Sequence, residues 1–238
     1  LLALVACLTV YPLKHPGIRP FLARKAGWKV RSDDALVTSE AATALEIYRW
    51  PIAWLMAFAF AINTFCYFGV AAWLPRILAE MLQMNSADAG FAASIYHVIG
   101  VIAPLTMMAL QRLIRGQTST ILGIVSCAWL LMPLGMLLLP SWWVVWSACG
   151  GLGQGAFFSI TFTLVIERTA TTAQTRTLSA LVQSLGYGLG ALGPWAIGRM
   201  VDLTANWFWP FIVLTVLTGS LVVISQVVAR STSRPHSR

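Results

Sequence analysis

Four polar side chains stand alone inside long apolar stretches of the sequence. They are Asn63, His97, Gln154 and Tyr187, which offer amide, imidazole and phenol groups. Such groups donate and accept hydrogen bonds without carrying a fixed charge. If each apolar stretch is centred on a lipid bilayer, all four fall near its midplane, where polar side chains usually face protein or a water-filled cavity. This pattern is typical of a wall that binds a small polar solute.

Three further residues lie within about one helical turn of this set. Tyr67, Phe158 and Gln183 are each four positions from one of the four residues, a spacing that shares a helical face. Any one polar residue is better explained by a single interhelical hydrogen bond, worth under about 1 kcal/mol. Four segments with such groups at one depth favour a common site. The predicted substrate-binding set is Asn63, Tyr67, His97, Gln154, Phe158, Gln183 and Tyr187.

Catalytic chemistry is not indicated by these stretches. His97 is the one side chain in them that titrates near neutral pH, which makes it the candidate for proton coupling. No stretch pairs two acids or a nucleophile with a base. The four cysteines lie singly, without His or Asp at metal-ligand spacing. We therefore expect no catalytic residue, no cofactor and no metal site, in a protein that is not an enzyme.

A glycine-rich segment matches the GxGxxG pattern of dinucleotide-binding folds at Gly188, Gly190 and Gly193. That fold requires a strand before the glycines and an acidic residue after the helix, and neither is present, so a nucleotide site is excluded. Small residues four apart instead predict ridges along which helices pack closely. The two ridges are Gly186, Gly190, Pro194 and Gly198, and Ser147, Gly151, Gly155, Ser159 and Thr163.

The predicted solute-binding residues and the two ridges of small residues belong to six uncharged runs, each long enough to cross a bilayer as a helix. About 20 helical residues span a hydrocarbon core of about 30 Å. The chain is 58% hydrophobic and only 10% charged, which is more apolar than a water-soluble domain of this size can bury. We predict an all-α integral membrane protein, a six-helix transmembrane bundle in the lipid bilayer. The predicted spans are 51–74, 89–110, 119–139, 142–166, 178–198 and 207–228.

Basic residues fall almost entirely in alternate gaps between these runs. Of the 16 Lys and Arg residues, only Arg76 and Arg199 lie in the other gaps. Because positive loops stay in the cytoplasm, the C-terminus is predicted to be cytoplasmic. The net charge of +8 then reflects topology, and without a soluble domain to present a basic face we exclude nucleic acid as a partner. The expected location is the plasma membrane, the inner membrane of a bacterium, with multiple passes.

Four segments follow from this organisation. Residues 1–13 are apolar but too short to cross a bilayer, which predicts the cytoplasmic end of a truncated transmembrane helix. Residues 14–49 form a cytoplasmic connector that either rests on anionic lipid or is a solvated linker. Residues 50–229 form the six-helix bundle and residues 230–238 a cytoplasmic tail. The sequence is therefore expected to be a fragment.

Short motifs form a further pattern between Trp50 and Trp207. They are Ala53-Trp54, Tyr67, Ala72-Trp73-Leu74-Pro75, Ala89-Gly90, GLGQG from Gly151 to Gly155 with Phe157-Phe158, and Leu178-Ser179, Gln183, Gly186-Tyr187 and Gly193-Pro194. Together they resemble the major facilitator superfamily, and within it the cyanate and 2-nitroimidazole transporter family. The resemblance implies two six-helix halves around a central cavity. This chain would carry helices 7–12 and a fragment of helix 6, with a missing N-terminal six-helix half as its partner.

The same resemblance implies transmembrane transport of a small polar or anionic solute by alternating access, in which one bundle rocks against the other. Two alternatives stay open, a non-transporting membrane scaffold and a half-size protein that acts as a dimer. A membrane-embedded enzyme would need paired acids, a metal cluster or an activated nucleophile, and the sequence offers none of these.

Overall fold

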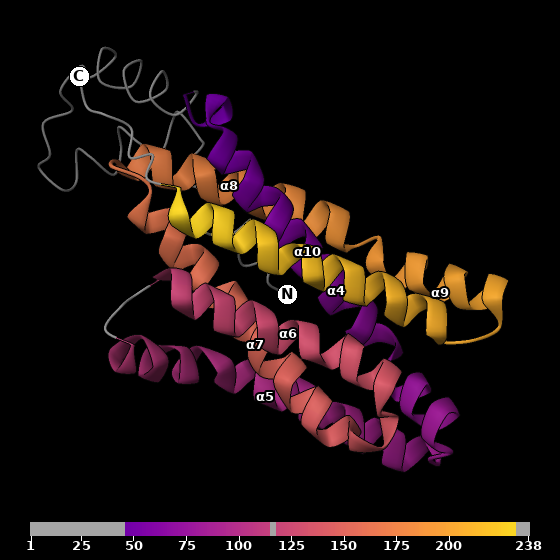
Figure 1. The fold of residues 1–238 in the computed structure, drawn as a ribbon. Helices are drawn as coiled ribbons and strands as arrows, with labels where there is room; N and C mark the ends of the chain where they lie inside the picture. The colour runs from indigo at the N-terminus through magenta and orange to yellow at the C-terminus, as the bar shows by residue number, and fades with distance from the viewer. Residues whose placement is uncertain (1–45, 115–117, 232–238) are drawn as a thin grey trace, which may run out of the picture. The chain divides into compact units, whose positions relative to one another are not determined.

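The computed structural model describes residues 46–114 and 118–231 of the 238-residue chain. The predicted fragment 1–13, nearly all of the connector 14–49 and nearly all of the tail 230–238 lie outside these residues. The described part is helical and contains no strand (Figure 1). Its elements are η1 (Ile47–Arg49), α4 (Pro51–Leu82), α5 (Ser86–Leu113), α6 (Thr118–Leu138), η2 (Pro140–Trp142), α7 (Trp143–Glu167), α8 (Thr172–Gly190), α9 (Gly193–Thr204) and α10 (Phe208–Arg230).

Local sequence sets where several of these helices begin. Pro51 stands in the first turn of α4, where its missing N–H leaves no bond unmade. The Asn85 side chain accepts a hydrogen bond from the Asp88 N–H at 2.9 Å and caps α5. The Thr171 hydroxyl accepts one from the Gln174 N–H at 3.2 Å and caps α8. In each case the first turn has fewer unpaired N–H groups, because a polar side chain accepts a hydrogen bond from one of them or because a proline has no N–H.

Five of the described helical segments are long and apolar enough to cross a membrane. They are α4, α5, α6, η2 together with α7, and α10, and they confirm the predicted spans 51–74, 89–110, 119–139, 142–166 and 207–228 as helices. α4 continues beyond its predicted end to Leu82. The described part of the chain is therefore all-helical and has the make-up of a multi-pass membrane protein.

The prediction of one unbroken helix over 178–198 is wrong. The chain forms α8 up to Gly190 and a separate α9 from Gly193, with a turn between them that is visible in Figure 1. Pro194 has no N–H to donate to the Gly190 carbonyl, and Gly190 and Gly193 lower the helix propensity beside it, which favours a break here. The proline alone is not the cause, because α4, α5 and α6 continue through Pro75, Pro104 and Pro133. α8 also begins earlier than predicted, at Thr172. Together α8 and α9 run the length of the bundle (Figure 1).

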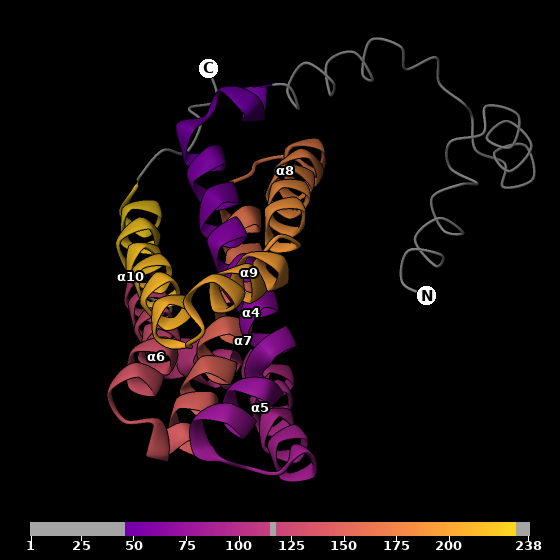
Figure 2. The ribbon, with the colours of Figure 1, turned by 90° about the vertical axis from the view of Figure 1, so that its right-hand side faces the viewer.

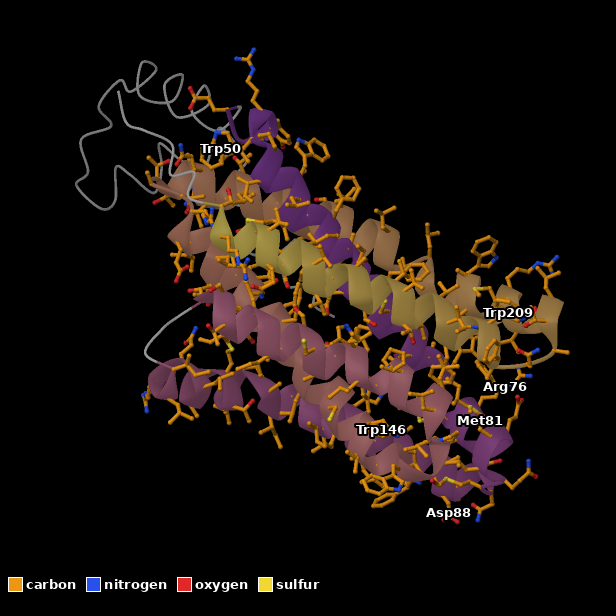
Figure 3. The ribbon with its side chains drawn as sticks, viewed as in Figure 1. Trp50, Arg76, Met81, Asp88, Trp146 and Trp209 are labelled. Carbon is orange, nitrogen blue, oxygen red and sulfur yellow. The ribbon has the colours of Figure 1, made fainter. Side chains whose placement is uncertain are left out.

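α4 and α7 make the most central contacts of the bundle. α4 lies between α8 and α10 (Figure 2), while α7 packs against both α5 and α6. α10 packs on α6 and so joins the two groups. Helices run in alternate directions, and Figure 3 accordingly shows Trp50 at one end of the bundle and Arg76, Asp88 and Trp146 at the other. Loops from distant parts of the chain therefore share an end.

The predicted ridges of small residues lie at close helix contacts. A Cβ added to Gly151 of α7 would come within 2.6 Å of the Tyr96 carbonyl oxygen of α5. A Cβ added to Gly190 of α8 would lie 2.7 Å from Oγ1 of Thr64 on α4. The backbones approach so closely because these positions carry no side chain, which confirms the packing prediction there.

Candidate solute-binding site

A cavity of about 330 Å³ lies among α4, α5, α7 and α8. Its volume suits a small ligand. Six of the seven residues predicted to bind a solute line it, namely Asn63, Tyr67, His97, Gln154, Phe158 and Tyr187. The rest of the wall consists of Thr64, Phe68, Gly100, Val101, Pro104 and Gly155. Helix packing thus brings together side chains that are far apart in the sequence.

Gln183, the seventh predicted residue, does not line this cavity. It is partly buried and lies four residues before Tyr187 on α8. That spacing gives the two residues one helical face, but the helix advances about 6 Å between them. The wall reaches Tyr187 and not the preceding turn, so the cavity does not support the prediction for Gln183.

The amide groups of the wall have hydrogen-bonding capacity to spare. Asn63 is only 1% exposed, and its Oδ1 has no hydrogen-bond partner among the described residues. Gln154 reaches the cavity from α7 and places its amide nitrogen beside Gly100 of α5. The Asn63 oxygen is itself covered, whereas the partly buried Gln154 amide lines the cavity and can form hydrogen bonds with a polar solute.

Aromatic rings make up much of the remaining wall. Phe158 and Tyr187 are 39% and 40% exposed, and both lean on the fully buried Phe60, whose ring centroid is 5.7 Å from each. Phe68 stacks with Tyr187 at 6.4 Å. Ring faces and edges of this kind bind planar or polarisable groups.

A second aromatic group surrounds His97. Tyr67 meets His97 edge to face with ring centroids 6.5 Å apart, and Tyr96 does so at 5.3 Å. Tyr96 is fully buried, and its hydroxyl has no hydrogen-bond partner in the part of the chain that the structure describes. The imidazole is therefore held by rings rather than by a charged neighbour.

No Asp, Glu, Lys or Arg is among the residues that line the cavity. Among the described residues, no group of three His, Cys, Asp or Glu side chains could hold a metal ion. The arrangement can bind a small solute through hydrogen bonds and ring contacts.

Several wall residues are absent from the sequence prediction. Val101 and Pro104 follow His97 by four and seven positions, a helical spacing that could have identified them. Thr64 and Phe68 adjoin the predicted Asn63 and Tyr67. Gly100 also follows His97 at helical spacing, by three positions, but the sequence does not show its importance, which lies in the space that it leaves.

Comparison with known proteins places the chain among transporters. A family model described as Major Facilitator Superfamily matches residues 1–194. The 2-nitroimidazole transporter of Escherichia coli is 26% identical over 203 residues, which cover 85% of this chain and 51% of that protein. The uncharacterized transporter YycB of Bacillus subtilis is 27% identical over 170 residues, covering 71% and 42%. The cyanate transport protein CynX of Escherichia coli is 24% identical over 193 residues, covering 76% and 47%.

The chain spans about half the length of these relatives, at 51%, 42% and 47% of each. The relatives for 2-nitroimidazole and cyanate confirm the resemblance that the sequence motifs indicated. The family model covers well over half of the chain, and the helical membrane bundle agrees with it. The chain therefore belongs to the Major Facilitator Superfamily of membrane transporters.

Proposed function

We propose that this chain forms half of a secondary transporter that carries a small polar or anionic solute across a bacterial inner membrane. The observation that supports this most directly is the cavity, whose wall lacks Asp, Glu, Lys and Arg and combines Asn63, His97 and Gln154 with aromatic rings. Two relatives are named for 2-nitroimidazole and cyanate, which are both small and polar. A few polar groups set in an aromatic wall match solutes of that size and chemistry.

A second six-helix half completes the binding site in this proposal. The chain spans only about half of its relatives, at 51% for the 2-nitroimidazole transporter, so an N-terminal half is the expected partner. Alternating access then moves one half against the other around the solute. Close backbone contacts, such as those at Gly151 and Gly190, favour movement of this half as a unit.

The C-terminus lies in the cytoplasm in the same proposal. The end of the bundle that carries Trp50 also receives the basic residues at the adjoining helix ends, while Arg76 marks the opposite end (Figure 3). An excess of Lys and Arg at one end is the usual sign of the cytoplasmic side. The basic residues near Trp50 are Arg49, Arg112, Arg168, Arg176 and Arg230.

Two substitutions in the full-length protein test the binding site. Gln154→Leu removes the carboxamide, and Tyr187→Phe removes only the phenol hydroxyl. Loss of one hydrogen bond to the solute costs about 1.4 kcal/mol, so uptake at low solute concentration is expected to fall about tenfold. Uptake of radiolabelled 2-nitroimidazole and cyanate into cells measures the loss, and immunoblots of isolated membranes check that the variants are equally abundant.

Tyr48→Phe serves as the matched control, because Tyr48 is 47% exposed and does not line the cavity. It is expected to leave uptake unchanged. Uptake at the wild-type level in both cavity variants would refute the site assignment. If the wild-type protein carries neither probe, the proposed solute class is wrong.

A further inference from the structure

We propose that Gly100 is a positioning residue that holds the carboxamide of Gln154 in place because it has no side chain of its own. The inference rests on the proposed function, since it concerns how the same cavity binds its solute. Gly100 lines the cavity from α5, and Gln154 lines it from α7.

α5 and α7 cross at Gly100. A Cβ added to Gly151 would lie 3.2 Å from the Gly100 nitrogen, and one added to Gly155 would overlap the Gly100 carbonyl oxygen. The Cβ at Gly155 would also lie 2.7 Å from Cβ of Ala103, one turn further along α5. Backbone contacts on both sides of the crossing fix the position of α5 along α7. α5 therefore cannot approach α7 more closely at this crossing.

The Gln154 amide occupies the space that Gly100 leaves free. A Cβ at position 100 would lie 2.6 Å from Nε2 of Gln154, well inside van der Waals contact, while the next neighbour, the Gly151 carbonyl oxygen, is at 3.6 Å. Within the described helices no hydrogen bond holds this carboxamide. Its position therefore depends on the space that Gly100 leaves free. His97 precedes Gly100 by three residues and thus shares its helical face. The amide and the imidazole consequently serve adjoining parts of the wall.

Alanine at position 100 separates the positioning role from folding. Only the end of a flexible side chain obstructs the added methyl group, so rotation of Gln154 relieves the overlap and the helices stay in place. Gly90, on the same helix, has nothing within 4 Å of an added Cβ. Gly100→Ala and Gly90→Ala gain similar helix propensity, so the two variants differ chiefly in what happens to Gln154.

Four variants of the full-length protein test the inference by transport kinetics: Gly100→Ala, Gly90→Ala, Gln154→Asn, and Gly100→Ala combined with Gln154→Asn. Uptake of radiolabelled 2-nitroimidazole and cyanate is measured against concentration. Gly100→Ala is expected to raise KM about tenfold with Vmax within about twofold of wild type, while Gly90→Ala changes neither. Because the shorter asparagine side chain at position 154 no longer meets the methyl group, the combined variant should match Gln154→Asn alone.

A cryo-EM structure of Gly100→Ala gives a readout that needs no transported solute. The Gln154 carboxamide is expected to leave its place beside residue 100, with the crossing of α5 and α7 retained. An unmoved carboxamide, a KM equal to that of Gly90→Ala, or additive KM effects in the combined variant would overturn the inference. If the wild-type protein carries neither probe, the proposed function fails for these solutes, and the structure of the variant still decides the role of Gly100.

Discussion

Phe60 shapes the cavity without lining it. Its ring is fully buried behind Phe158 and Tyr187, and it touches both. Gly186 of α8 makes room for this ring, because a Cβ at Gly186 would overlap the edge of Phe60. The position of two wall residues therefore depends on a glycine and a phenylalanine in the layer behind them.

Gly186→Ala is expected to destabilise the protein by about 1 to 3 kcal/mol, the usual cost of overpacking a well-filled core. Gly188→Ala is the matched control, because nothing lies within 4 Å of a Cβ at Gly188, which is on the same helix. Its effect should stay within about 0.5 kcal/mol. Thermal unfolding of the purified protein in detergent measures both variants, and equal midpoints would contradict the role given to Phe60.

At the scale of elements, α4 is bonded to the chain on both sides of the break between α8 and α9. The Thr64 hydroxyl donates to the Gly186 carbonyl oxygen of α8 at 2.7 Å. The Trp73 indole N–H donates to the Pro194 carbonyl oxygen of α9 at 2.8 Å. These two hydrogen bonds fasten the chain to α4 before and after the break.

Trp73→Phe tests this support. The substitution keeps an aromatic ring but removes the N–H, so a loss of about 1 kcal/mol in stability is expected. Trp54→Phe is the control, since the Trp54 N–H donates to the Tyr48 carbonyl oxygen just before the same helix and joins no second transmembrane helix. Thermal unfolding should show the lower midpoint for Trp73→Phe. Equal midpoints, or a lower midpoint for Trp54→Phe, would contradict the support that the Trp73 hydrogen bond gives to α9.

For the whole molecule, the placing of arginine and the directions of the helices indicate how the bundle is oriented in the membrane. The membrane-crossing helices alternate in direction, so the C-terminal end of α5 and the C-terminal end of α6 lie at opposite ends of the bundle (Figure 1). Arg112 stands at the end of α5, whereas Trp142 and Trp143 stand at the start of α7. Arginine favours the cytoplasmic side, and tryptophan favours either membrane interface.

Epitope tags inserted after Leu113 and after Ser141 of the full-length protein test this orientation. In intact spheroplasts, antibody is expected to reach the tag after Ser141 only. The tag after Leu113 should become accessible once the membrane is permeabilised, because its loop is predicted to be cytoplasmic. Accessibility of both tags before permeabilisation, or of the Leu113 tag alone, would contradict the proposed topology.

Some residues of the cavity wall could be predicted from the sequence, and others could not. Asn63, His97 and Gln154 could be predicted as wall residues, because depth in a bilayer can be estimated from the position within an uncharged run. Gly100 could not be recognised as a wall residue, because its spacing from His97 does not show which helix packs against that face. Gln183 shares the helical face of Tyr187 but lies one turn away from the wall, a difference in height that spacing alone does not reveal.

The sequence by itself determined that this protein consists of membrane-crossing helices, because transfer of a segment into lipid depends on the residues of that segment alone. It also carried signals for the break after Gly190, in Gly190, Gly193 and Pro194, but α4 continues through Pro75, so the break became evident only in the structure. Which polar groups share the cavity was decided by the tertiary structure. That outcome depends on the rotation of each helix about its axis and on where the helices cross. Contacts between segments distant in the chain, such as that of Gly100 with Gly155, determine the rotation and the crossing.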